Sequence, residues 1–271
     1  LSWPQTKVIT LSTSDLSTTP SQNWSVFSKS QTDVPCQLNN SKNQAPTLSI
    51  LVEDLPAVGY QVLWVCPSAQ PIQTTTFKHY ILENQFLKAT IAPNTGTITS
   101  LIEKITHQEV FSQPGNQLQV FQDKGQYWDA WNIAPDYIDH PLLTPTVQAI
   151  EWTETGPITQ RLRVTYRINQ STIHQTYRLD ATSPYLEVEN EIDWQETQVL
   201  LKAHFPLNVT ADIATYEIPF GAIARTTNPT TAAEKAQWEV PALRWADLTQ
   251  TDASFGTSIL TSGKHGFDAS P

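Results

Sequence analysis

The chain has 271 residues, which is long enough for one large domain or two medium ones with substantial cores. Its 16 basic and 26 acidic residues give a net charge of −10, which argues against nucleic acid or an anionic membrane as a partner, because both require clustered Lys and Arg. No apolar run approaches the ~20 residues of a membrane-spanning helix. Cys36 and Cys66 are too few for a disulfide framework, so we expect two free thiols in a reducing compartment, with one disulfide as the alternative.

Residues 1–70 are predicted to form a small β domain. Two β-branched runs, at 7–11 and 47–52, are bounded by polar turn clusters and favour short strands. A third run at 60–65 alternates apolar and polar side chains after a turn, which is also typical of a strand. The segment Ser68–Thr76 is rich in Gln and Thr and is predicted to be a connector.

Residues 71–271 are predicted to form a second, larger β domain. It begins with two short strands within 77–91, followed by a polar turn at Pro93–Gly96 and a strand at 97–102. The turn is expected to carry no chemistry, since polar turns are the ordinary connection between strands.

The clearest strand signal lies in three runs of period two, at 160–168, 171–179 and 186–194. The first places arginines on one face, and the third places glutamates on its polar side. We expect these faces to pair across neighbouring strands, at ~0.2–1 kcal/mol per opposite pair, as solvated sheet surface. Only Thr231–Trp238 is a fair candidate for a short helix, so the predicted fold class is all-β, with two antiparallel sandwiches.

The stretch Asp123–Ile133 does not fit any regular element. It gathers Tyr127, Trp128 and Trp131 around one carboxylate, Asp129, within five residues. Flat aromatic faces beside a hydrogen-bonding carboxylate suit a sugar, whose ring has apolar C–H faces and a rim of hydroxyls. The alternative is a buried corner, in which Asp129 accepts from indole or backbone N–H groups and the rings fill core.

This stretch resembles a block in the glycoside hydrolase family 38 α-mannosidases, particularly the cytosolic and vacuolar branch, which carries a Trp-Asp-Ala-Trp-Asp segment. Trp128 to Trp131 match that segment, while Asn132 replaces its second aspartate. Further blocks agree in order and spacing, and the last is close to the family's Lys-Tyr-Gly-Phe-Asp. These blocks are Phe220–Thr227, Trp238–Val240, Arg244–Leu248 and Lys264–Asp268.

The resemblance implies a carboxy-terminal segment made of two β-sandwiches, at 1–70 and 71–271, the larger being a galactose-mutarotase-like supersandwich. The parent would be a cytoplasmic, zinc-dependent enzyme that hydrolyses terminal α-mannosidic bonds with retention. Because the family holds its nucleophile and zinc ligands in an amino-terminal part, we expect no catalytic residue and no zinc in this segment. The absence of methionine and the start at Leu1 also indicate a piece of a longer chain.

The resemblance further implies that the segment forms a wall of the sugar site. Tyr127, Trp128, Asp129 and Trp131 would stack on and hydrogen-bond a mannose-containing oligosaccharide, beside the amino-terminal catalytic domain of the same chain. Arg225 and Asp247 are further candidates.

The residues themselves leave alternatives open. Arg225 could form an ion pair that ties a loop to a sheet, and packing is favoured for Trp238, Arg244 and Trp245. A stand-alone carbohydrate-binding module and a purely structural spacer remain the rival functions.

Overall fold

The computed structural model describes residues 5–16, 23–39, 45–68, 79–125, 128 and 131–270. Strands dominate this part of the chain, and its helices are two 3-10 turns, η1 (Thr13–Asp15) and η2 (Tyr137–Asp139), and α1 (Ala232–Lys235). The predicted all-β class is therefore confirmed. Within the same residues, none of the helices has the length and hydropathy of a membrane span.

Two compact units share the chain, and their segments alternate along the sequence. Unit 1 consists of Leu1–Gly96, Glu103–His107 and Thr146–Trp194. Unit 2 consists of Thr97–Ile102, Gln108–Pro145 and Gln195–Pro271. The predicted domain boundary between residues 70 and 71 stays a prediction.

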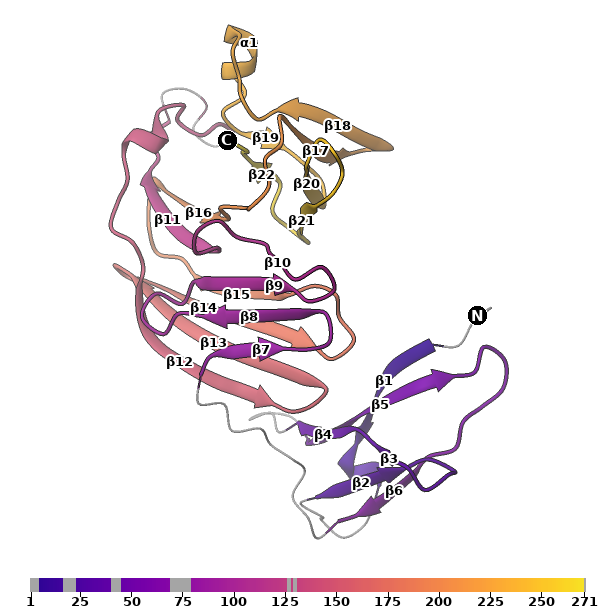
Figure 1. The fold of residues 1–271 in the computed structure, drawn as a ribbon. Coiled ribbons are helices and arrows are strands. Elements are labelled where there is room, and N and C mark those ends of the chain that lie inside the picture. The colour runs from indigo at the N-terminus through magenta and orange to yellow at the C-terminus, as the bar shows by residue number, and fades with distance from the viewer. Residues whose placement is uncertain are drawn as a thin grey trace. The chain divides into compact units, whose positions relative to one another are not determined.

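Unit 1 begins with two small sheets of three strands each (Figure 1). The first has the order β1 (Gln5–Ser12), β5 (Thr47–Leu55), β4 (Cys36–Asn39), and the second β3 (Asp33–Val34), β2 (Trp24–Phe27), β6 (Trp64–Pro67). Their shared core contains Trp24, Val26, Leu48, Ile50 and Val52. The expected strands at 7–11 and 47–52 are confirmed, and both cysteines are free thiols.

The third expected strand, at 60–65, forms only from Trp64 onward. Its neighbour β2 ends at Phe27, which lies opposite Trp64, so the register offers no paired residue to Tyr60 or Val62. Tyr60 is consequently 85% exposed, and the alternation that predicted a strand there was misleading.

The larger sheet of unit 1 is a meander of four antiparallel strands (Figure 1). These strands are β12 (Thr146–Thr155), β13 (Thr159–Ile168), β14 (Ser171–Asp180) and β15 (Glu187–Asp193). They contain the three runs of period two. Leu162, Val164 and Tyr166 on β13 are almost fully buried, whereas Arg161 and Arg163 point to the other face, as the alternation predicts.

A hairpin of β7 (Ile81–Glu83) and β8 (Leu87–Ile91) packs against that sheet. The Asn84 amide donates to the carbonyl oxygens of Asp180 and Ser183, at 2.7 and 2.8 Å. The turn that follows β8 ends at Gly96, whose φ of 69° is left-handed. The Tyr177 hydroxyl donates to the Gly96 carbonyl at 2.7 Å, so the turn lies directly on the core of the sheet.

Charges on the polar face of the sheet pair across strands, although Arg161 of the first run reaches Glu189 across the intervening β14 instead of on a neighbouring strand. Arg161 lies 3.3 Å from Glu189, and Arg178 lies 3.3 Å from Glu187. These side chains are partly exposed, so each pair contributes little to stability.

Unit 2 is assembled from short sheets (Figure 1). It contains β9 (Ile98–Glu103, whose last residue belongs to unit 1) and β10 (Gln108–Glu109). Two strand pairs follow, β11 (Gln117–Gln122) with β16 (Val199–His204), and β19 (Val240–Pro241) with β22 (Gly266–Phe267). A sheet of four strands has the order β18 (Gly221–Thr226), β17 (Ile213–Ile218), β20 (Trp245–Thr249), β21 (Gly256–Leu260). Ala214, Tyr216, Val240 and Ala242 form the buried cluster of unit 2.

The helix expected at 231–238 is a single turn, α1. Thr231 and Glu234 form a capping box at its start, which explains why the helix begins there. No residue of α1 is buried, and without an apolar face packed on the protein a helix gains little from growing longer.

Candidate functional site

The aromatic stretch Asp123–Ile133 lies in the connection from β11 to β12, which belongs to unit 2. Hydrogen bonds fix the two ends of this stretch, at Asp123 and next to Ala134. The Asp123 carboxylate accepts from the Ala134 N–H at 2.9 Å, and the Asp123 N–H donates to Gln198 at 2.9 Å. The Trp128 carbonyl accepts from the N–H groups of Trp131 and Asn132, at 2.7 and 3.1 Å. Trp128 and Trp131 therefore belong to one tight turn.

Both tryptophan side chains of this turn are exposed, Trp128 at 80% and Trp131 at 88%. Trp128 also has a φ of 56°, a left-handed conformation that costs a non-glycine residue roughly 1 kcal/mol. The alternative in which these two rings fill a core is therefore wrong for this chain. Tyr127 and Asp129 lie outside the described residues, and the role of all four in binding stays a prediction.

Arg225 and Asp247 do not come together. In the register of the sheet, Arg225 on β18 lies opposite Ala214, and Ala214 lies opposite Leu248 on β20. Asp247 precedes Leu248, so its side chain emerges on the opposite face from Arg225. The two cannot line one pocket.

Each of these two residues has local partners instead. The Asp247 carboxylate accepts from the hydroxyls of Thr249 and Ser258, at 2.8 and 2.7 Å. Arg225 donates to the Gln237 amide oxygen at 2.7 Å, so the described contact is not the ion pair considered as its alternative. Arg244 donates to the Glu217 carboxylate at 2.6 Å, which ties β17 to the start of β20 and fits a packing role.

Sequence reasoning missed an ionic group of unit 2 that is built on Lys202 of β16. Its ammonium donates to Tyr137 Oη at 2.6 Å, to Asp268 Oδ1 at 2.5 Å and to Glu239 Oε1. The Lys202 and Glu239 side chains are only 17% and 14% exposed. No motif surrounds Lys202 in the sequence, although Glu239 and Asp268 each lie in a block that resembles the family.

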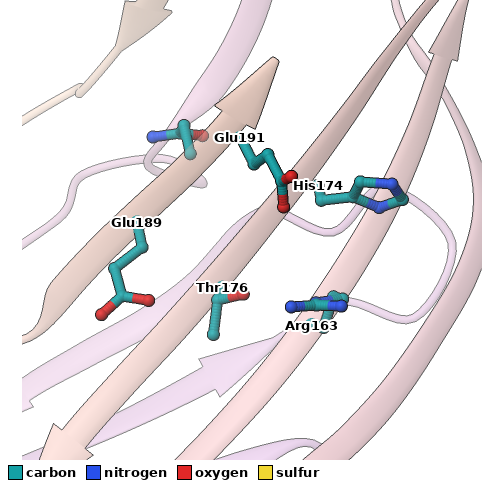
Figure 2. Close-up of a pocket in the computed structure, with 6 residues that line it drawn as sticks. Arg163, His174, Thr176, Glu189 and Glu191 are labelled. Carbon is teal, nitrogen blue, oxygen red and sulfur yellow. The ribbon is translucent and has the colours of Figure 1, made fainter. Parts of the chain in front are cut away.

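A shallow depression of about 240 Å³ lies on the charged face of the large sheet of unit 1 (Figure 2). Its lining is Arg163, His174, Thr176, Glu189, Asn190 and Glu191. The side chains labelled in Figure 2 come from three strands: Arg163 from β13, His174 and Thr176 from β14, and Glu189 and Glu191 from β15. Among the described residues, no group of three or more His, Cys, Asp or Glu side chains is arranged to hold a metal ion.

Comparison with known proteins identifies the family. Residues 82–271 match the glycosyl hydrolases family 38 C-terminal domain, which defines the class as a C-terminal β domain of a glycosyl hydrolase. The chain belongs to glycosyl hydrolase family 38, which confirms the resemblance drawn from the sequence blocks.

Two relatives carry names from this family. Alpha-mannosidase 2C1 of Mus musculus is 30% identical over 230 residues, covering 80% of this chain and 22% of that protein. Alpha-mannosidase G of Dictyostelium discoideum is 34% identical over 197 residues, covering 69% of this chain and 18% of that protein. The chain thus spans about a fifth of the length of these relatives.

The fold also matches a solved structure. An alpha-mannosidase from Enterococcus faecalis V583 superposes with a TM-score of 0.66 at 11% identity, covering 98% of this chain and 37% of that one. At this identity the likeness concerns the fold alone.

Proposed function

We propose that this chain is the carboxy-terminal β segment of a cytoplasmic, zinc-dependent α-mannosidase that hydrolyses terminal α-mannosidic bonds with retention. The segment scaffolds the enzyme and contributes one wall of its sugar site. The observation that carries this proposal is the exposed Trp128–Trp131 turn in a chain of this family. Both indole rings are held outward, and Trp128 keeps a left-handed backbone to do so, which favours a role in contact with a ligand.

In this proposal the aromatic turn recognises mannose through two kinds of contact. The indole faces of Trp128 and Trp131 stack on the C–H face of the sugar ring, and the Asp129 carboxylate accepts from its hydroxyls. A charge-assisted hydrogen bond of this kind is worth about 1.5–3 kcal/mol, which is enough to fix the orientation of the sugar.

The zinc ion and the nucleophile belong to the proposed amino-terminal part of the parent enzyme. The described residues of this chain do not fit a zinc ion, because they contain no suitable cluster of ligands. We therefore assign no zinc ligand and no covalent step to this chain. Its residues bind and orient the sugar.

The test is Asp129→Asn in the full-length protein. We expect kcat/KM on an aryl α-mannoside to fall about 10- to 150-fold, with the thermal midpoint near that of the wild type, because the lost bond acts on the sugar. Both quantities are measured on one preparation. Asp139→Asn removes an exposed carboxylate of the same loop and serves as the control. A lower midpoint with unchanged kinetics of the folded enzyme would refute the proposed role.

The rival function, a carbohydrate-binding module that acts alone, draws on the same exposed tryptophans. It predicts that mannose changes the tryptophan fluorescence of the isolated chain. The wall-of-the-site proposal requires the amino-terminal part to complete the site, so the isolated chain should show no such change.

A further inference from the structure

Lys202 is the centre of a partly buried ionic group that uses all three of its donors. The ammonium meets one phenol oxygen and two carboxylates, from Tyr137, Glu239 and Asp268. A lysine ammonium has three N–H donors, so this environment satisfies it fully. The Tyr137 hydroxyl accepts from Lys202 and also lies 3.4 Å from Glu239 Oε1, which closes the group.

The two carboxylates reach Lys202 from a single pair of short strands. In the pairing of β19 with β22, Val240 lies opposite Phe267. Glu239 precedes the first and Asp268 follows the second, so in an antiparallel register their side chains project from the same face. The strand pair therefore presents both carboxylates together to the cation on β16.

The third partner belongs to the loop that carries the aromatic turn. Tyr137 lies in η2, and its ring packs edge-on against Phe121 of β11, with centroids 5.2 Å apart. The N–H of Tyr137 donates to Ala134, and the N–H of Ala134 donates to the Asp123 carboxylate. The chain of contacts from Lys202 thus runs through Tyr137 to the base of the loop that contains Trp128 and Trp131.

Electrostatic attraction stabilises the contact of Lys202 with Glu239 and Asp268. Burial alone would lower the pKa of Lys202, but hydrogen bonds to Asp268, Glu239 and Tyr137 outweigh burial and hold the pKa above that of an ordinary lysine. Lys202 therefore stays charged at physiological pH. Without this cation, Glu239 would be a nearly buried carboxylate next to a second negative charge.

We infer that Lys202 is a positioning residue, whose ionic contact with Tyr137, Glu239 and Asp268 holds the connection from β11 to β12 where Trp128 and Trp131 meet the sugar. This inference rests on the proposed function and deepens it. It links two family-like blocks, those of Glu239 and Asp268, and the loop of Tyr137 through a residue that belongs to none of them.

Lys202→Met in the full-length protein tests the inference, with Lys235→Met, an exposed lysine of α1, as the matched control. A loop displaced by about 1 Å lowers turnover up to 100-fold, so we expect kcat/KM to fall about 10- to 100-fold well below the melting temperature. The amides of Ala134, Tyr137 and His140 should exchange hydrogen faster, while those of β17 keep their rates. The control should change neither measurement.

Tyr137→Phe is the second variant, in case Lys202→Met does not fold. It keeps the ring on Phe121 and removes only the hydroxyl, so the same changes should appear in weaker form. The inference is overturned if kcat/KM stays within about twofold of the wild type, or if loop and β17 exchange rise equally. A wild type without mannosidase activity would refute the proposed function instead, and loop exchange alone would then decide the role of Lys202.

Discussion

The role of Lys202 could not be predicted from the sequence around it. It sits in Val199–His204, which reads as an ordinary strand, and its partners lie 65, 37 and 66 residues away along the chain. Trp128 and Asp129, by contrast, stand out because their neighbours in sequence are unusual. Local composition was enough to predict the aromatic turn at Trp128 and Trp131. The ionic group of Lys202 becomes visible only in the folded chain, because its members are far apart in sequence.

At the residue scale, Gly96 is the position where a substitution is expected to lower the stability of the fold. A Cβ at this position would lie 2.1 Å from Tyr166 Oη and 2.8 Å from Val164 Cγ1, at a φ of 69°. Crowding of a packed core and left-handed strain together predict that Gly96→Ala lowers the free energy of unfolding by about 2–4 kcal/mol. Denaturant titration of the purified chain measures this loss.

Gly59→Ala tests backbone strain without crowding. Gly59 also has a positive φ, 121°, but an added Cβ would meet nothing within 4 Å. We expect this variant to lose about 1–3 kcal/mol from strain alone. A loss at Gly96 of only about 1–2 kcal/mol, the cost of a left-handed residue, would show that the contact with Tyr166 has no energetic weight.

At the scale of elements, strands with clean alternation could be predicted from the sequence, but the register in which strands pair could not. The runs at 160–168, 171–179 and 186–194 became β13, β14 and β15, because a buried apolar face enforces period two. Arg225 and Asp247 were candidates because each lies in a block that resembles the family, yet the register places them on opposite faces of one sheet. Register depends on neighbouring strands, which a linear pattern does not contain.

The capping box of α1 predicts a pH dependence. Hydrogen bonds from the backbone N–H groups of Thr231 and Thr230 lower the pKa of Glu234 to about 2 from an ordinary value of 4.5. Because the folded pKa is depressed, the stabilisation of this turn is present above pH about 4.5 and is lost as the pH falls toward 2. An NMR titration of the Glu234 carboxyl group should show a midpoint near 2.

Thr231→Pro checks the cause of this shift. Proline has no N–H, so the variant removes the largest contribution and should move the midpoint upward. A wild-type midpoint near 4.5 would mean that the capping box does not form in solution.

At the scale of the whole molecule, the chain covers only about a fifth of its relatives' length. We predict that the isolated segment of 271 residues hydrolyses no aryl α-mannoside, with or without added zinc, because the nucleophile and metal ligands lie elsewhere in the proposed enzyme. The assay compares release of the aryl group with a protein-free blank, and elemental analysis measures bound zinc. Hydrolysis above the blank, or one zinc per chain, would contradict the prediction.

The alternation of the two units along the sequence has a consequence for biosynthesis. The Asn84 amide finds its acceptor at Asp180, 96 residues later, so the ribosome delivers the second partner long after the first. At roughly 5–20 residues per second, this delay is about 5–20 s. Leu87, Ala89 and Ile91 of the same hairpin are buried in the finished fold, and during that interval they precede the strands β12 to β15 that complete unit 1. A chain truncated before β14 would therefore expose this apolar surface and aggregate, and it would not form a smaller folded protein.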